Sequence, residues 1–188
     1  MLTAQQLADA CHCRLSVAQR WLGPTVQAME RYGIDTPQRQ AAFLAQIAHE
    51  SGRFQYVREI WGPTPAQRRY EGRADLGNTV PGDGRRFLGR GLIQITGRNN
   101  YRAAGLALEI DLIRAPERLE EPEFAALSAA WFWRSKGLNE LADLGDFDKI
   151  TRRINGGTNG IEDRRALWAS ARAALEQRCQ QGQGPEGD

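Results

Sequence analysis

The chain has 188 residues and a formal net charge of only +2 at pH 7, from 25 basic and 23 acidic residues. This balance does not suggest a nucleic-acid coat or a polybasic membrane anchor, and no apolar run approaches the roughly 18 residues of a membrane span. Hydrophobic residues make up 41% of the chain, which predicts an ordinary core rather than disorder. We therefore expect one compact domain over residues 1–179, followed by a flexible, Gly- and Gln-rich tail at 180–188.

The first third of the sequence predicts three helices. Apolar residues recur at helical spacing over residues 3–21, which indicates a first helix there. Pro24 suits a first helical turn and Gly33 a helix end, so a short second helix is expected between them. The pair Thr-Pro at 36–37 is a start signal for a third helix, which should end at Gly52.

The middle of the chain has a different character. Glycine and proline punctuate residues 61–91, so this segment is expected to be mostly loop, with one short helix near residues 66–70. Such a long irregular segment in a structured domain commonly serves binding or catalysis. The run at 92–96, LIQIT, alternates weakly and predicts a strand or an extended segment.

Helical patterns resume downstream, at residues 99–104, 123–135, 147–154 and 161–178. Residues 125–133 are nearly all apolar, which predicts a buried central helix. Few strands are indicated. The expected fold is therefore mainly α, of an α+β lysozyme-like kind, with two helical lobes around a cleft that the Gly-rich middle borders.

Two glutamates are candidates for acid–base chemistry. Phe43, Ile47 and Glu50 share one face of the third helix, so the carboxyl of Glu50 continues an apolar stripe at a helix C-terminus. Partial burial and the helix dipole both disfavour the charged form, as a general acid requires. Glu59 follows nine positions later, and a chain reversal would bring it opposite, in the arrangement used for glycoside hydrolysis. A solvated Glu50 and a surface Glu59 paired with arginine are the alternatives.

Other catalytic chemistries lack their motifs. His49 precedes Glu50, but the second histidine of a His-Glu-x-x-His zinc site is missing. Cys11 and Cys13 have the wrong spacing for a structural zinc site and are expected to be small, half-buried helix residues. Neither a Gly-x-Ser-x-Gly motif nor a phosphate-binding loop is present. No metal and no cofactor are therefore expected.

Several segments, in their order along the chain, resemble the family 19 glycoside hydrolases. They are AAFLAQIAHESG, VREIWGPTPAQRRYEGR, GNTVPGDGRRFLGRGLIQITGRNNY, RRINGGTNG and DRR. The likeness covers residues 38–168, and the family comprises plant-type chitinases and peptidoglycan-degrading phage and bacterial relatives. The short gap between Glu50 and Glu59 and the block at 77–91 look most like phage endolysins and prophage- or pyocin-encoded lysozymes.

The resemblance implies an inverting, metal-free hydrolysis. Glu50 matches the general acid, Glu59 the general base, and Thr96 the hydroxyl residue that helps to hold the attacking water. Further matches at the substrate site are Gln94, Asn100, Asn155 and Arg164. Arg164 is also implied to lie close to the acid and to tune it. One departure is Asn159, which stands where plant enzymes have a glutamate; without the resemblance, the amides would be interpreted as loop-bracing groups.

Aromatic side chains fall into two groups. Those near the motifs, which could stack on sugar rings, are Tyr56, Trp61, Tyr70 and Tyr101. Those in the apolar helix, which are expected to belong to the core, are Trp131, Phe132 and Trp133.

We predict a monomeric peptidoglycan glycosidase that cleaves the β-1,4 bond between N-acetylmuramic acid and N-acetylglucosamine. The alternative is a chitinase acting on N-acetylglucosamine polymers. The N-terminus has no signal-peptide pattern, so we expect cytoplasmic synthesis without stable membrane association. The protein would then reach the cell wall through a holin or on lysis. A helix-turn-helix DNA-binding module at residues 2–21 and a non-catalytic wall-binding module are the competing functions.

Overall fold

The computed structural model describes residues 1–181, with side chains as far as Glu176. The α-helices are, in chain order, α1 (Ala4–Cys11), α2 (Leu15–Arg31), α3 (Pro37–Glu50), α4 (Pro65–Arg68), α5 (Asp83–Arg86), α6 (Arg98–Leu108), α7 (Pro122–Ser135), α8 (Leu138–Asp143), α9 (Phe147–Asn155) and α10 (Ile161–Gln181). Two short 3₁₀ helices are η1 (Ala74–Leu76) and η2 (Pro116–Glu120). The tail expected at 180–188 lies outside the described residues, except for its first two residues, which continue α10.

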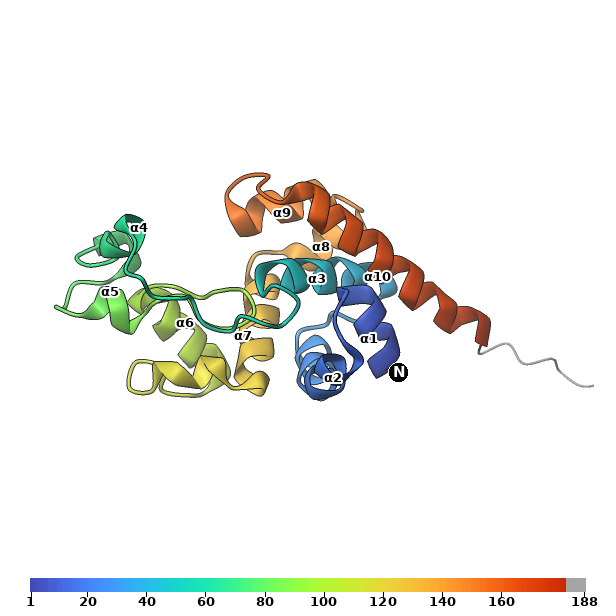
Figure 1. The fold of residues 1–188 in the computed structure, drawn as a ribbon, viewed down its shortest axis with the longest axis horizontal. Coiled ribbons are helices and arrows are strands. Elements are labelled where there is room, and N and C mark those ends of the chain that lie inside the picture. The colour runs from blue at the N-terminus through green and yellow to red at the C-terminus, as the bar shows by residue number, and fades with distance from the viewer. Residues whose placement is uncertain (182–188) are drawn as a thin grey trace, which may run out of the picture.

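The helices form two lobes, as the sequence predicts (Figure 1). The larger lobe holds α1, α2, α3, α8, α9 and α10, and within it α10 packs along α3 and α1. The smaller lobe holds α4, α5 and α6. Helix α7 contacts α2 and α8 on one side and α6 and η2 on the other, so it joins the two lobes.

The N-terminal helices differ from the sequence prediction. Instead of one helix over 3–21, α1 ends at Cys11, because His12 adopts a left-handed conformation with φ 50°. Helix α2 then continues straight through Pro24, where a new helix was expected. Proline removes one backbone hydrogen bond there, but α2 buries Trp21 and Met29 in the core, and this burial outweighs the local loss.

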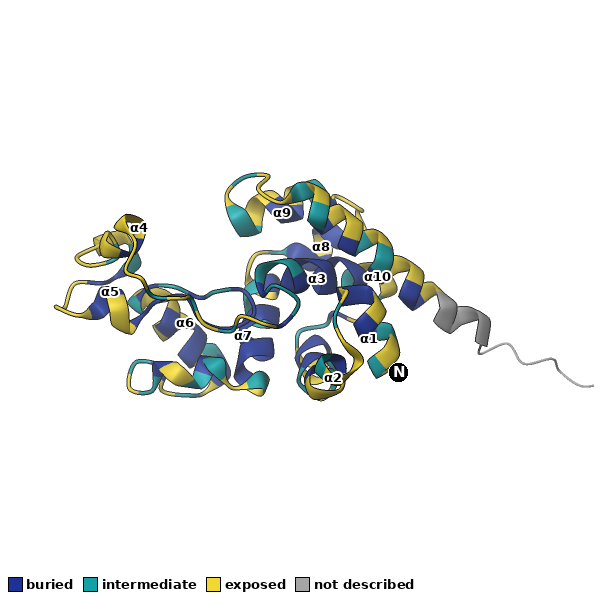
Figure 2. Ribbon diagram, in the orientation of Figure 1, coloured by how far each residue is buried: buried dark blue, intermediate teal, exposed yellow. Residues whose placement is uncertain are grey.

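Because α1 and α2 bury their apolar faces against α10, α3 and α7, they form part of the core (Figure 2). This packing explains their amphipathic pattern without a DNA-binding module. Over residues 1–181, none of the helices combines the length and the apolar character needed to cross a bilayer.

Helix α3 follows its start and stop signals. The Thr36 side chain accepts a hydrogen bond from the Arg39 amide at 3.2 Å, and Pro37 occupies the first turn. At the other end, the Ser51 hydroxyl donates to the Ile47 carbonyl at 2.6 Å and accepts from the Phe54 amide at 2.9 Å. These bonds end the helix sharply and fix the position of Glu50, its last residue.

Helix α7 is the predicted buried central helix. Residues 124–130 are all buried, and the ring of Trp133 packs edge-on against Phe43 of α3, with ring centroids 5.5 Å apart (Figure 2). Helices α5 and α8 were not predicted; each has at most six residues, too few to display a helical period.

The segment at 92–96 does not form a strand. In the described part of the chain only two isolated bridges occur, between Arg58 and Arg90 and between Arg90 and Ile95. These bridges tie the segment after α3 to the loop before α6. They thereby bring Glu59 next to the motif that contains Gln94 and Thr96.

Candidate active site

Glu50 lies at the C-terminal end of α3 and is bound by a buried arginine. Its Oε1 accepts a hydrogen bond from Arg164 Nη2 at 2.5 Å, and the two side chains are 21% and 2% exposed. The remaining guanidinium nitrogens of Arg164 donate to the Gln46 side chain and, at 3.2 Å, to the Asn159 carbonyl. The cation therefore has one fixed orientation beside Glu50.

Gln46 extends this network into the core. It is fully buried, and its amide nitrogen donates to the Thr151 hydroxyl at 2.8 Å, which in turn donates to the Phe147 carbonyl at 3.1 Å. The chain of bonds links α3, α10 and α9. The orientation of Glu50 thus depends on three of the helices of the larger lobe.

His49 belongs to a separate set of hydrogen bonds beside this network. Its Nδ1 lies 2.6 Å from Asp163, which also accepts a hydrogen bond from Arg53. Partial burial tends to raise the pKa of Asp163, but the hydrogen bonds from Arg53 and His49 outweigh it and lower that pKa. His49 thus connects α3 to α10 through Asp163.

Glu59 lies in the smaller lobe among neutral donors. Its Oε1 accepts from the Gln67 amide at 2.9 Å and the Tyr70 hydroxyl at 3.3 Å, and its Oε2 accepts from the Gly89 amide at 3.1 Å. The arginines closest to it in the sequence lie elsewhere: Arg53 pairs with Asp163, and Arg58 is near Glu120. Burial, followed by the charge of Glu59, raises the pKa of Tyr70, so this hydroxyl remains a donor.

Three predicted side chains meet around Gly89. A Cβ placed on this glycine would lie 2.8 Å from Gln94 Oε1 and 3.3 Å from both Glu59 Oε2 and Thr96 Oγ1. Gln94 adopts a left-handed backbone conformation, φ 58°, which is uncommon for a residue with a side chain. The Thr96 hydroxyl donates to the Gln94 carbonyl at 3.0 Å. The structure therefore gathers Glu59, Gln94 and Thr96 into one polar cluster.

A groove of about 400 Å³ adjoins this cluster, and we call it the central groove. It is lined by Leu76, Ile93, Gln94, Ile95, Thr96, Asn100, Trp131, Phe132, Ser135, Lys136 and Ile154. Residues of the smaller lobe form one wall, and α7 with the end of α9 forms the other. Trp131 and Phe132 thus line the groove rather than belonging wholly to the core, whereas Trp133 is fully buried, as expected.

The amino-acid sequence matches the family model described as chitinase class I over residues 30–142. The chain belongs to glycoside hydrolase family 19. A family 19 domain-containing protein of Haemophilus influenzae is 36% identical over 168 residues, which cover 74% of this chain and 82% of that protein. An endochitinase of Arabidopsis thaliana is 42% identical over 119 residues, which cover 62% of this chain but only 39% of the plant protein.

Solved structures show the same fold. Chitinase C of Streptomyces griseus superposes with a TM-score of 0.75 at 24% identity, covering 93% of this chain and 76% of that one. A further bacterial family 19 chitinase superposes with a TM-score of 0.75 at 24% identity, covering 99% and 97%. This family 19 chain is therefore a chitinase-like glycoside hydrolase with the mainly helical, two-lobed architecture of its relatives.

The other predicted substrate residues lie at different depths in this family 19 fold. Asn100 is exposed at the groove, and its amide donates to the Thr96 carbonyl at 2.7 Å. Asn155 is half-buried next to Ile154, which lines the groove. Arg164 is almost wholly buried, so it contacts Glu50 rather than offering a surface to a sugar.

The prediction that Tyr101 contacts substrate is wrong, because its side chain is fully buried. Its hydroxyl donates to the Leu88 carbonyl at 2.6 Å and accepts from Arg90 at 2.9 Å, and burial raises the pKa of Tyr101. Tyr101 thus stabilises the loop that contains Leu88 and Arg90. Conversely, sequence reasoning missed Gln46 and Gln67, although the pattern Thr64-Pro-Ala-Gln67 is a recognisable capping box that could have drawn attention to the second of them.

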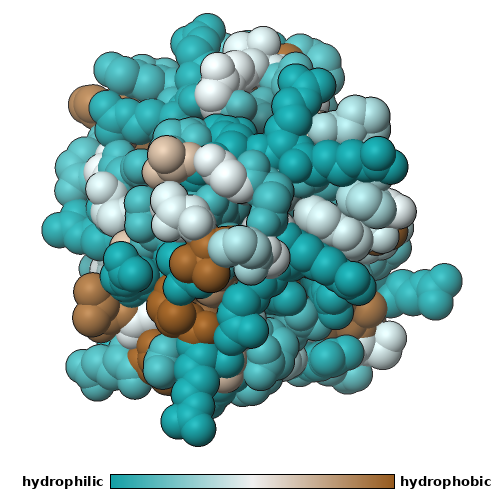
Figure 3. Space-filling model, turned by 90° about the vertical axis from the view of Figure 1, so that its left-hand side faces the viewer, coloured by the Kyte–Doolittle hydropathy of each residue, from teal (hydrophilic) through white to brown (hydrophobic). Residues whose placement is uncertain are grey.

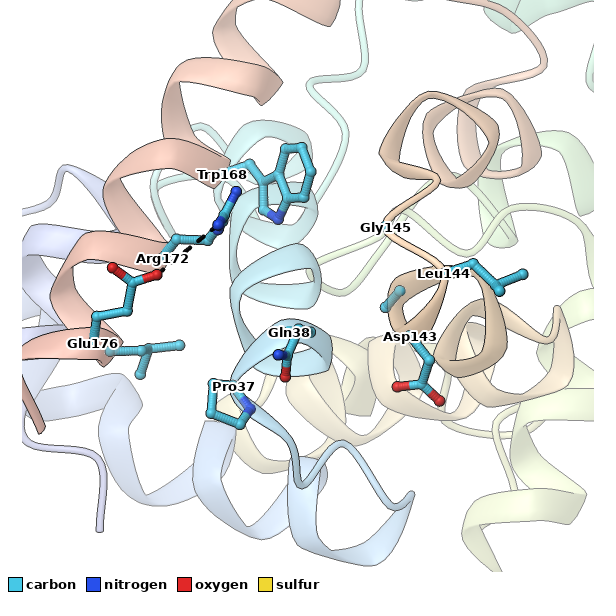
Figure 4. A pocket seen from close by; sticks show the side chains of 10 residues that line it. Pro37, Gln38, Asp143, Leu144, Gly145, Trp168, Arg172 and Glu176 are labelled. Carbon is cyan, nitrogen blue, oxygen red and sulfur yellow. Dashed lines mark ion pairs between the residues drawn. The ribbon is translucent and has the colours of Figure 1, made fainter. Parts of the chain in front are cut away.

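Two other hollows lie away from the carboxylates. One, of about 470 Å³, is at the N-terminal end of α3, opposite to the end that bears Glu50, and includes Pro37, Trp168 and Arg172 (Figure 4). The other, of about 350 Å³, is at the end of α6 in the smaller lobe. The outer end of this lobe is mostly hydrophilic, with hydrophobic side chains gathered in the lower half of the view (Figure 3). Neither of them includes a predicted site residue, nor does a smaller hollow of about 230 Å³ that Met1, Val26 and Ile34 help to line, so the central groove is the candidate substrate site.

Proposed function

We propose that this protein is an endolysin-type peptidoglycan glycosidase that hydrolyses the β-1,4 bond between N-acetylmuramic acid and N-acetylglucosamine with inversion. The observation that carries the proposal is the cluster of Glu59, Gln94 and Thr96 at the central groove, on the opposite lobe from Glu50. The proposal includes cytoplasmic synthesis and release to the cell wall through a separate pore-forming protein or on lysis. The enzyme would act there as a monomer.

In the proposed mechanism Glu50 protonates the glycosidic oxygen. Arg164 occupies its Oε1, which leaves Oε2 to carry the proton, and the guanidinium stabilises the carboxylate that remains after donation. Glu59 removes a proton from a water molecule that Thr96 helps to hold. This water attacks the anomeric carbon from the face opposite to the leaving group, which requires carboxyl groups about 6.5–9.5 Å apart.

The choice of polymer rests on charge. Lys136 lines the central groove, and no aspartate or glutamate stands among the residues that line it. The lysine is exposed, with Nζ 5.5 Å from the ring centroid of Phe132. Chitin is uncharged, whereas the peptide stems of peptidoglycan carry carboxylates that a groove cation would attract. This feature favours peptidoglycan.

Chitin is the second candidate polymer, because the similar plant proteins and solved bacterial structures are named as chitinases. The two candidates share the N-acetylglucosamine unit and the same chemistry. Digestion of purified sacculi, borohydride reduction and mass spectrometry separate them. We expect fragments that end in reduced muramic acid; reduced glucosamine ends, or products from chitin alone, contradict the proposed bond.

Replacing either carboxylate tests the mechanism. Glu50→Gln and Glu59→Gln should each lower the rate of sacculus lysis by several orders of magnitude while the protein remains folded and binds cell walls. The exposed Glu123→Gln is the control and should retain the parent rate. Retention of more than about a tenth of the rate by Glu59→Gln would mean that another group activates water. NMR of the fresh product should show an inverted anomer.

A further inference from the structure

Gln67 belongs to a capping box at the start of α4. The Thr64 hydroxyl accepts from the backbone N–H of Gln67 at 3.2 Å, and the side-chain oxygen of Gln67, Oε1, accepts from the backbone N–H of Thr64 at 2.8 Å. The same Oε1 also accepts from the Gly62 amide at 3.1 Å. The residue is only 4% exposed, so this side chain lies inside the loop that follows Glu59.

The nitrogen of the Gln67 side-chain amide contacts Glu59. Gln67 Nε2 donates to Glu59 Oε1 at 2.9 Å and to the Ile60 carbonyl at 2.8 Å. Both donors and both acceptor positions of the amide are therefore used. A flipped amide would point its oxygen at a carboxylate and a carbonyl, so only one orientation satisfies the network.

We propose that Gln67 is a positioning residue for Glu59, a role that rests on the proposed function of Glu59 as the base. Gln67 and Tyr70 both donate to Oε1 of Glu59. The other carboxylate oxygen, Oε2, accepts from the Gly89 backbone amide and lies on the side of Thr96 and Gln94. Gln67 thereby determines that Oε2 of Glu59 is the oxygen that faces the attacking water. Gln67 does not line the central groove, so it acts on the chemical step and not on sugar binding.

The chain contains a matched control for the loss of a capping box. At the start of α1, Gln6 Oε1 accepts from the Thr3 amide at 3.0 Å, and the Thr3 hydroxyl accepts from the Gln6 amide at 3.2 Å. Gln6 Nε2 donates to the Ala174 carbonyl at 3.2 Å, in the other lobe from Glu59. Gln6→Met therefore removes a similar cap without touching the site.

The test compares Gln67→Met with Gln6→Met in two measurements: the steady-state hydrolysis of soluble peptidoglycan fragments, and thermal unfolding. We expect Gln67→Met to lower kcat about tenfold to a hundredfold with KM unchanged within error. Gln6→Met should lose a similar amount of stability and keep the parent kcat. Equal kcat values for both variants, or a rise in KM that accounts for the whole loss, would overturn the proposal.

Gln67→Glu separates positioning from folding. A glutamate at this position still completes the capping box, but it places a second carboxylate against Glu59. We expect a folded protein with reduced kcat, whose acid-side loss of activity moves to higher pH. A parent-like kcat and pH profile would refute the role of Gln67. If instead Glu59→Gln itself retains full activity, the assignment of Glu59 as the base fails. That outcome can be told apart from a failure of the role of Gln67, because it does not involve the Gln67 variants.

Discussion

Gly89 is the residue around which the polar cluster forms. Because it lacks a side chain, Gln94, Glu59 and Thr96 all approach its Cα closely, while its amide donates to Glu59 at 3.1 Å. The atom that a new Cβ would meet first, at 2.8 Å, is the far end of the flexible Gln94 side chain. A small change here can therefore disturb the chemistry without breaking the core.

We predict that Gly89→Ala lowers kcat/KM about tenfold or more and shifts the unfolding temperature by only a few degrees. Initial rates of lysis and thermal unfolding measure the two effects. Gly157→Ala is the control, because nothing lies within 4 Å of its Cβ and its φ is not positive. Full activity in Gly89→Ala would show that the cluster tolerates a displaced Gln94.

The motif around residue 100 shows what a sequence can and cannot predict about individual side chains. Adjacent residues on a helix point about 100° apart, so Asn100 faces the groove while Tyr101 faces the core. The motif gives the residue types, but it does not show where α6 begins. The start of the helix determines the directions in which the two side chains point. The partners of Glu59 were also missed. Arginines are its charged neighbours in the sequence, whereas the structure supplies neutral donors from Gln67, Tyr70 and Gly89.

At the scale of elements, α2 is the clearest failure of local signals. Gly23 and Pro24 predict a boundary, yet the helix passes through both because its buried face packs on α7. Gly23 is exposed, and beyond its two neighbours in the chain a Cβ on it would meet nothing within 4 Å. The glycine weakens the helix by its flexibility, but it also avoids the clash that a Cβ at this position would have with the ring of Pro24.

Gly23→Ala should change the free energy of unfolding by less than about 0.5 kcal/mol, because the gain of alanine over glycine in a helix is opposed by the clash of its Cβ with the ring of Pro24. Urea unfolding measures the change. Gly97→Ala gives the contrast: its φ is +90°, and a Cβ would lie 2.8 Å from the Cβ and 2.9 Å from the carbonyl of Leu76, so we expect destabilisation. Equal effects of the two substitutions would contradict this account.

The ion pair between Asp83 and Arg98 joins α5 to the start of α6. Two hydrogen bonds from Arg98, at 2.5 and 2.8 Å, lower the pKa of Asp83 despite its burial. A carboxyl with a lowered folded pKa contributes stability above its unfolded pKa, near 3.9, and loses that contribution as the pH falls through the folded value. The smaller lobe should therefore weaken in acid.

We predict that the free energy of unfolding of the parent protein falls more steeply than that of Asp83→Asn below about pH 4. Urea titrations at a series of pH values compare the two slopes. Asp75→Asn, which breaks a pair with an aspartate side chain 64% exposed, is the control and should change the slope less. Parallel curves for the parent and Asp83→Asn would remove this pair as a source of acid sensitivity.

At the scale of the whole molecule, the pattern of helices was enough to predict a mainly helical fold with two lobes. It was not enough to predict which distant residues meet. Glu50 and Arg164 lie 114 positions apart, and Glu59 and Gly89 lie 30 apart. Periodicity reports only on neighbours within a few turns, so the first pair was implied by the resemblance to a family, and the second was not predicted at all.

The charge of the central groove leads to the last prediction, which concerns the polymer. With a net charge of only +2, the molecule attracts anions weakly as a whole, so recognition of a charged polymer must depend on local cations such as Lys136. We predict that Lys136→Gln raises KM for peptidoglycan about threefold to tenfold, as expected for loss of one partly solvated ion pair. On peptidoglycan whose carboxyl groups have been converted to amides, the variant and the parent should have equal KM values.

Two comparisons make this prediction decisive. Lys149→Gln removes the only other lysine of the chain, at an exposed position of α9 outside the groove, and should leave KM unchanged on both polymers. Added salt should narrow the difference between Lys136→Gln and the parent, because it screens the pair. If Lys136→Gln raises KM equally on the native and the amidated polymer, the lysine contacts the sugar itself. The charge argument for peptidoglycan over chitin then fails, while the acid–base mechanism stands.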